Sequence, residues 1–416
     1  MKRTIILIAV CLIATTIRAQ QIDYTTYIQK VLSQNPAFKA AQLDLEASQA
    51  DLKTARKITD PVLSAEYGNN SDWDIEMGES MSIELSKTIS LGKRSARIHV
   101  AENSLKASEA GLLDFTSQLR SEATNAYLDA LLAQEQMRIA EESANNLAKL
   151  YQSDSLRAAR GDISELDALQ SKLEANIAKQ DHLSARAKYQ NALLTLGQYM
   201  GQAQMGTSSI AGHLAVPNRT YHPAQLIDSA LAHRQDLLAA QHLSDAAQSE
   251  LTALRRERTP DIDIALGANY NTRVRNEEAP APQFIGYTAG ISIPLPVSNL
   301  NRGEVRSGQI RIQQAQLQTE ILRNQIQVEI LQAYNNYQAA ISRAADFDSF
   351  LMGNAQQVLQ GRLYAYSRGE TTLLEVLNAQ HTYNEIQQAY AEALHDCMQA
   401  WVELNRAAAI WDIDIR

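Results

Sequence analysis

The sequence predicts a mainly α-helical fold with a small β part, built as two halves that share one plan of helix, strand, strand, helix, turn and helix. Three observations predict it. The 416 residues include only 17 glycines and 9 prolines, well below the average usage of about 7% and 5%, which favours few, long elements. Similar residues recur at matching positions in the two halves. Four short segments alternate between apolar and polar side chains, as half-buried strands do.

Residues 1–19 predict a secretory signal peptide. Lys2 and Arg3 carry positive charge, residues 4–15 are apolar, and a small residue, Ala19, ends the segment. Cys11 lies inside the apolar run and follows a valine rather than a small residue, so we expect no lipid anchor. We expect an exported protein.

Composition and charge exclude several classes of protein. With 45% hydrophobic and 20% charged residues, the chain is not expected to be disordered. The formal net charge of −9 argues against a nucleic-acid partner, which is usually held by neutralising phosphates. Beyond the signal peptide, no apolar run reaches the roughly 18 residues of a membrane-spanning helix. An exported chain of this kind is periplasmic, extracellular, or inserted in an outer membrane through β-strands.

An internal repeat divides the mature chain. Arg160-Gly161 matches Arg368-Gly369 at an offset of 208 positions, and Pro61 matches Pro260 at a slightly shorter offset. The sequence therefore predicts a first structural repeat at 20–210 and a second at 211–416.

Each repeat begins with a helix, at about 23–59 and 223–259, that ends before a proline, since proline disfavours helix in the residue before it. Two strands follow in each repeat. The four predicted strands are 61–70, 80–89, 261–270 and 284–293. Each is close to the 9–11 residues that a tilted strand needs to cross a bilayer. A water-exposed antiparallel sheet with one wet face is the alternative for the same pattern.

Long helices are predicted at 93–159 and 301–367, which contain no proline. In the first, apolar residues alternate spacings of four and three from Leu119 to Tyr151, which indicates a left-handed coiled coil. Most residues of this seam are alanine, so neighbouring helices can approach closely. Glycine turns at 160–164 and 368–372 then lead into the last helix of each repeat.

No motif for catalysis, phosphate binding or metal binding is present. The eight histidines include no close pair. We therefore expect no enzymatic activity, no cofactor and no metal site.

The duplicated plan and the two Arg-Gly-acidic turns resemble the outer-membrane efflux protein (TolC) family over essentially the whole mature chain. Ile293-Pro294-Leu295-Pro296, followed by Asn299-Leu300-Asn301-Arg302-Gly303, is most similar to its cation-efflux (CzcC- and CusC-like) branch. The resemblance implies a homotrimer whose strands form a 12-stranded β-barrel in the outer membrane of a Gram-negative bacterium, in contact with its lipid. A long α-helical barrel would continue it through the periplasm.

The resemblance also implies partners: a periplasmic adaptor (membrane fusion) protein and an inner-membrane pump of the resistance–nodulation–division type. The channel would be a passive conduit that exports metal cations or other small toxic compounds. A periplasmic adaptor or an exported coiled-coil scaffold is the alternative, which the matched strand pairs argue against.

Family members contact the adaptor through the tips of their helical hairpins. Carried over to this chain, the tips are Arg160, Gly161, Asp162, Ile163, Ser164, Leu166, Arg368, Gly369, Glu370, Thr371, Thr372, Leu373 and Leu374. The periplasmic aperture is carried over as Asp167, Tyr366, Glu375 and Asn378. Tyr366 is expected to bond Asp167, and three copies of Glu375 are expected to form a carboxylate ring that favours cations.

Overall fold

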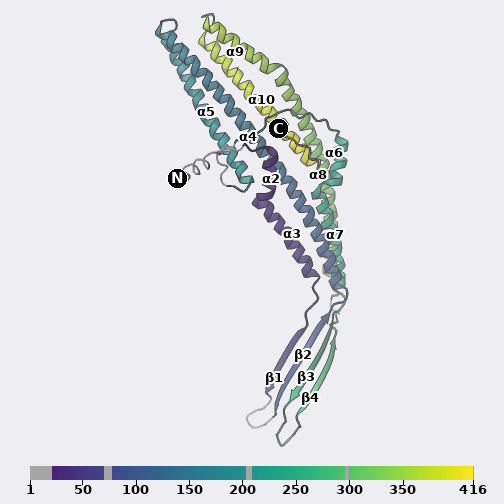
Figure 1. Cartoon of the computed structure of the whole chain (residues 1–416). Helices are drawn as coiled ribbons and strands as arrows, with labels where there is room; N and C mark the ends of the chain where they lie inside the picture. The colour runs from purple at the N-terminus through teal and green to yellow at the C-terminus, as the bar shows by residue number, and fades with distance from the viewer. Residues whose placement is uncertain (1–20, 70–76, 203–208, 296–298, 416) are drawn as a thin grey trace, which may run out of the picture. The chain divides into compact units, whose positions relative to one another are not determined.

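The computed structural model describes residues 21–69, 77–202, 209–295 and 299–415 (Figure 1). The predicted signal peptide at 1–19 and its Cys11 lie outside the described residues. The chain forms two compact units, one of residues 1–41, 113–234 and 323–416 and one of residues 42–112 and 235–322. Each unit combines corresponding stretches from both predicted repeats.

The prediction of a mainly helical chain with a small β part is confirmed. The helices are α2 (Tyr24–Gln34), α3 (Pro36–Ala55), α4 (Lys93–Ala159), α5 (Glu165–Tyr199), α6 (Pro223–His233), α7 (Gln235–Arg256), α8 (Arg302–Asp346), α9 (Met352–Ser367) and α10 (Leu373–Ala407), with a π-helical turn, η1 (Phe347–Leu351), between α8 and α9. The strands are β1 (Val62–Asn69), β2 (Glu79–Ile89), β3 (Ile262–Asn271) and β4 (Phe284–Ser292). Among the described residues, no helix is both long and apolar enough to cross a membrane.

The prediction of one helix at the start of each repeat was wrong, because each repeat starts with two helices: α2 and α3 in the first, and α6 and α7 in the second. Pro36 begins α3, and the side-chain oxygen of Asn35 accepts hydrogen bonds from the backbone N–H groups of Ala37 (2.8 Å) and Phe38 (3.1 Å). This is an N-cap followed by proline at the first helical position, a combination that starts a new helix. In the second repeat, Arg234 has extended backbone between α6 and α7, and its guanidinium lies 2.6 Å from the carboxylate of Glu329.

The four strands form one antiparallel sheet in the order β1-β2-β3-β4. The register pairs Leu63 with Leu85, Leu85 with Leu266, and Leu266 with Ala289. Apolar side chains therefore share one face, where Leu63, Leu85 and Leu266 are each at least half exposed. The other face carries polar and small residues, including Glu84 and Gly267. The outer strands β1 and β4 each have a neighbour on one side within this sheet.

In the first unit, aromatic side chains attach α2 to α4. The ring of Tyr127 lies 5.6 Å from that of Tyr24 and 5.3 Å from that of Tyr27. The Tyr127 hydroxyl also donates to the carbonyl oxygens of Ile22 (3.0 Å) and Ala211 (2.6 Å). Tyr127 lies off the predicted seam of α4, so this helix packs on more than one side.

A one-residue shift in a buried seam accompanies the π-helical turn. From residue 326 to the end of α8, the buried residues are Ile326, Ile330, Ala333, Tyr337, Ala340 and Ala344, at spacings of four and three. Continuing those spacings predicts buried positions at 354 and 358, whereas Ala355 and Leu359 are buried in α9. A π turn holds one more residue than an α turn. The extra residue in η1 therefore keeps both seams buried.

Candidate functional site

The two hairpin tips are closed by the same backbone motif. At the end of α4, Gly161 N–H donates to the Ala158 carbonyl (2.9 Å) and Asp162 N–H to the Arg157 carbonyl (2.9 Å). At the end of α9, Gly369 and Glu370 make the corresponding bonds to Tyr366 (3.1 Å) and Ala365 (2.9 Å). This is the Schellman motif, which needs a left-handed residue at the glycine position. Gly161 and Gly369 have φ of 82° and 79°, so both turns favour glycine for conformational reasons.

The predicted tip residues differ in what they expose. Leu166 is 76% exposed and Leu374 is 58% exposed, whereas Leu373 is only 4% exposed. Leu373 packs in a core cluster with Leu147 and Tyr366, so its side chain supports the tip from inside. Ile163 is half-buried. The remaining predicted tip residues are exposed or, for Thr371, half-buried: Arg160, Gly161, Asp162, Ser164, Arg368, Gly369, Glu370, Thr371 and Thr372.

Tyr366 and Asp154 meet between α9 and α4. The Tyr366 hydroxyl donates to Oδ1 of Asp154 at 3.0 Å, and both side chains are buried. The expected bond from Tyr366 to Asp167 was therefore wrong. Asp167 instead forms hydrogen bonds at the start of α5. Its carboxylate accepts a hydrogen bond from the Ser164 hydroxyl (2.8 Å), and its backbone N–H donates one to the same hydroxyl oxygen (3.0 Å). Ser164 is thus the N-cap of α5.

Arg157 also contacts Tyr366, and no sequence pattern pointed to this residue. Its guanidinium lies 4.9 Å from the centre of the Tyr366 ring, and it donates to the Tyr366 carbonyl at 3.4 Å. Burial raises the pKa of Asp154, although hydrogen bonding from Tyr366 and the charge of Arg157 act in the opposite direction. Burial, together with the adjacent Asp154 charge, also raises the pKa of Tyr366. Oδ2 of Asp154 is buried with no hydrogen-bond partner among the described residues.

Glu375 lies on the exposed start of α10. Its carboxylate pairs with Arg362 of α9 at 3.0 Å and accepts a hydrogen bond from Thr371. Asn378, one turn further along α10, is exposed. The residue at the predicted ring position is therefore paired with a cation of its own chain.

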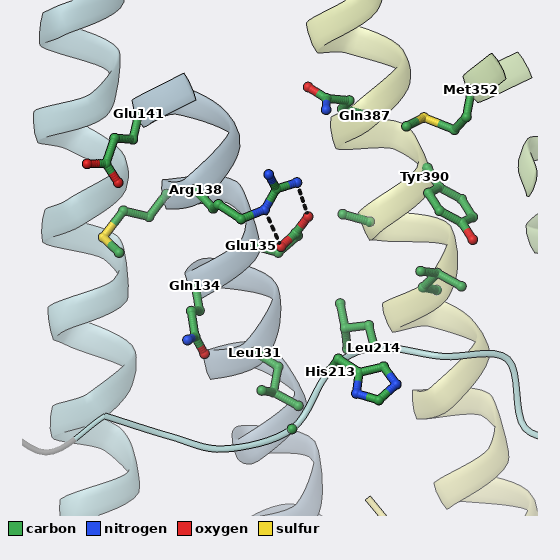
Figure 2. Close-up of a pocket in the computed structure, with 14 residues that line it drawn as sticks. Leu131, Gln134, Glu135, Arg138, Glu141, His213, Leu214, Met352, Gln387 and Tyr390 are labelled. Atoms are coloured by element: carbon green, nitrogen blue, oxygen red, sulfur yellow. Dashed lines mark hydrogen bonds and ion pairs between the residues drawn. The ribbon is translucent and has the colours of Figure 1, made fainter. Parts of the chain in front are cut away.

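A cavity of about 520 Å³ lies between α4, α10 and the connecting segment that carries His213 and Leu214 (Figure 2). Arg138 in its wall is bonded to both carboxylate oxygens of Glu135, at 2.7 and 3.0 Å. Its other contact is with Glu142 at 3.1 Å. The guanidinium of Arg138 is therefore paired within α4. Within the described ranges, no group of three or more His, Cys, Asp or Glu side chains is arranged to hold a metal ion.

Comparison with known proteins gives a consistent result. Residues 27–202 and 226–409 match the model of the family described as "Outer membrane efflux protein". The chain is 28% identical over 374 residues to the cobalt-zinc-cadmium resistance protein CzcC of Cupriavidus metallidurans, covering 88% of this chain and 85% of CzcC. It is 24% identical to the cation efflux system protein CusC of Escherichia coli O157:H7, covering 86% of this chain and 79% of CusC. A crystal structure of CusC superimposes with a TM-score of 0.76 at 19% identity, covering 94% of this chain and 93% of that one.

Proposed function

The chain belongs to the outer membrane efflux protein family, and we propose that it is the passive conduit of a tripartite efflux system that exports metal cations or other small toxic compounds. Proteins of this family are outer membrane efflux channels, located in Gram-negative bacteria with their helical part in the periplasm.

The observation that carries the proposal is the sheet. Its exposed apolar face, with Leu63, Leu85 and Leu266, is what a lipid-facing barrel surface requires. The free edges of β1 and β4 leave ladder hydrogen-bonding groups that a bilayer cannot satisfy. Pairing β1 of one copy with β4 of the next would satisfy them.

The number of copies follows from barrel geometry. Four strands cannot close, since about eight is the usual minimum. Two copies would give an eight-stranded barrel filled by its own side chains, whereas three give twelve strands with room for a lumen. We therefore propose a homotrimer, in agreement with the family resemblance.

The two hairpin tips are the proposed docking surface for the periplasmic adaptor, which connects the channel to an inner-membrane pump of the resistance–nodulation–division type. Exposed Leu166 and Leu374 support this role, because they lie beside turns whose exposed residues are polar or glycine. A small apolar patch with a polar rim is typical of a protein interface. The buried Leu373 is proposed to hold the tip in shape rather than to touch the partner.

The periplasmic aperture is proposed to involve Tyr366, Glu375 and Asn378 on α9 and α10, with Asp167 on α5. The bond between Tyr366 and Asp154 and the pair between Arg362 and Glu375 support it, because each ties α9 to a neighbouring helix. Moving α9 away from α4 breaks the first contact, and moving it away from the start of α10 breaks the second.

Metal cations are the proposed first class of cargo. The relatives named above are described as a cobalt-zinc-cadmium resistance protein and a cation efflux protein. Other small toxic compounds are the second class. In this architecture we assign substrate selection to the pump and adaptor.

The test begins with the detergent-extracted outer-membrane fraction. We expect the mature chain there as a trimer by mass, with heat-modifiable migration on gels. A soluble monomer or dimer in the periplasm would contradict the channel. With the trimer established, a deletion strain should become sensitive to divalent metal salts and recover with the full-length gene. If the deletion strain keeps its metal tolerance but becomes more sensitive to organic toxins, the cargo would be small toxic compounds other than metal cations.

A further inference from the structure

Basic residues collect where the sheet joins the helices of its own unit. The register brings Val62, Ile89, Ile262 and Ser292 to the same end of the sheet. Helices α3, α4, α7 and α8 each end or begin within about ten residues of these strand ends. Six exposed arginines at this place are named the junction cluster: Arg56, Arg94, Arg255, Arg256, Arg258 and Arg302.

The charge of this region is opposite to that of the whole chain. The joining segments 53–60, 87–97, 255–261 and 299–306 contain twelve Lys and Arg against four Asp and Glu, while the chain has 38 against 47. The hairpin end of the sheet has no such excess. In the described residues 77–79 and 271–283, Arg273 and Arg275 face three glutamates. The positive charge is therefore confined to the helical end.

Local contacts hold part of the junction cluster in place. Arg94 donates twice to the backbone carbonyl of Arg56, at 3.0 and 2.6 Å. The side chain of Arg256 lies over Gly92, within 3.4 Å of where a Cβ would stand. Because Gly92 has φ of +80° and no side chain, it allows this close approach.

Three of the four acidic residues in the joining segments are paired with a lysine: Asp60 pairs with Lys57, and Glu257 and Asp261 pair with Lys93. Lys93, largely buried, contacts Glu257 at 3.3 Å and Asp261 at 3.0 Å. Arg56 pairs with Glu102 at 3.2 Å. Within the described ranges, Arg255, Arg258 and Arg302 form no ion pair with an acidic side chain. Three exposed guanidinium groups are therefore available to an external anion.

We propose that the junction cluster binds the phosphate groups of anionic phospholipids at the periplasmic surface of the outer membrane. The inference rests on the proposed function, in which the apolar face of the sheet lies in the bilayer. Residues just beyond the strand ends then lie at the level of the lipid headgroups. The guanidinium fork matches phosphate oxygens in two-point contacts, and basic residues beside an anionic membrane surface are attracted to it. The cluster would fix the depth of the sheet in the membrane.

The test is lipid competition with the purified full-length trimer. Detergent-solubilised protein is offered an equimolar mixture of phosphatidylglycerol and phosphatidylcholine, and the retained lipids are counted by native mass spectrometry. The wild type should retain phosphatidylglycerol preferentially. The preference should fall by about fivefold for each arginine removed in Arg255→Gln, Arg258→Gln and Arg302→Gln, made singly and together. It should also weaken as salt is raised.

The matched control is Arg273→Gln with Arg275→Gln, which removes two guanidinium groups from the hairpin end of the sheet. This control should keep the wild-type preference. Equal retention of both lipids by the wild type, or an equal loss in the control, would overturn the inference. So would displacement of phosphatidylglycerol by inorganic phosphate at the same concentration, since the site would then recognise the free anion.

Single-channel conductance separates the two proposals. The triple variant should conduct as the wild type does in neutral bilayers, because the junction cluster is not placed in the conduit. A conducting wild type without lipid preference would end the lipid inference and leave the proposed function standing. A wild type that neither inserts nor conducts would overturn both.

Discussion

The hydroxyl of Tyr366 in α9 donates a 3.0 Å hydrogen bond to Oδ1 of Asp154 in α4, 212 residues earlier in the chain. The bond joins the two halves of the duplicated sequence, yet it has no counterpart by symmetry. At the repeat offset, Tyr366 corresponds to Ala158 and Asp154 to Arg362. The two hairpins share their turns but differ in the contacts just inside them.

Replacing Tyr366 by phenylalanine should destabilise the protein by about 1–3 kcal/mol, because it leaves a buried carboxylate without its donor. Tyr364→Phe is the matched control, since Tyr364 is exposed two residues earlier on the same helix. Denaturant unfolding of the solubilised protein gives the comparison. Equal unfolding free energies for the two variants would show that the bond contributes nothing.

The buried Asp154 should make stability depend on pH. Burial raises its pKa above the ordinary value of 3.8, so the native state binds a proton more readily than the unfolded state. Stability from this group is fully present below 3.8 and is lost as pH rises through the raised pKa. Asp154→Asn should therefore gain stability relative to the wild type at pH 7, and the gain should shrink as pH falls. A difference that stays constant between neutral and acid pH would contradict this.

Glu329 should make stability depend on pH in the opposite direction from Asp154. Burial acts to raise its pKa, but hydrogen bonds from Arg234 and Arg406 prevail and lower the pKa below 4.5. Its stabilising contribution is present above 4.5 and is lost as pH falls through the lowered pKa. Glu329→Gln should therefore be least stable relative to the wild type at neutral pH, with the deficit narrowing in acid. Thermal unfolding of both variants and the wild type from about pH 3 to about pH 7, the range in which carboxylates titrate, tests both predictions.

Ion selectivity should respond in opposite directions to the two partners of one ion pair. Glu375→Gln removes a carboxylate from the proposed aperture and should reduce the preference for cations. Arg362→Gln removes the cation 3.0 Å from that carboxylate and should increase the preference. The measurement is the reversal potential in planar bilayers under a potassium chloride gradient. Reversal potentials that stay the same in both variants would exclude Glu375 from the selective part of the conduit.

Adaptor docking should depend on the two exposed leucines of the tips. Leu166→Ser with Leu374→Ser should lower metal resistance while trimers form normally, because apolar contact area is lost from an interface. Leu243→Ser is the control, since Leu243 is 55% exposed but belongs to α7 and not to either hairpin tip. Normal resistance in the double variant, or a similar loss in the control, would exclude these side chains from docking.

Much of the fold could be predicted from sequence because it depends on periodicity. Each strand begins and ends within one residue of its predicted limits, since alternation over a run of about ten residues leaves little freedom in register. The Schellman turns follow from Gly161 and Gly369.

The partner of Tyr366 was missed, although Asp154 stands at the next four-and-three position after Tyr151 in the seam. A carboxylate at a buried seam position needs a hydrogen-bond partner, and that signal could have identified it. The contacts of Arg157 and Arg362 depend on which helices become neighbours, which the local pattern of a helix does not reveal.

The π-helical turn yields the last prediction. Because η1 supplies the one residue by which the seams of α8 and α9 differ, deleting Phe350 should convert the segment into continuous α-helix. The buried positions Ala344 and Ala355 would then be ten residues apart, a spacing that continues the four-and-three pattern. Phe350 is exposed, so its removal takes nothing from the core, and the variant should form trimers with near-normal stability.

Deleting Gln136 from α4 is the contrasting change, because it displaces the second half of an uninterrupted seam by one residue. That shift should cost several kcal/mol, about as much as removing a large core side chain, and should abolish trimers. If the Phe350 deletion is as damaging as the Gln136 deletion, η1 does more than absorb a residue. The loss would then be assigned to the packing of Phe347 against Tyr390, whose rings lie 6.3 Å apart.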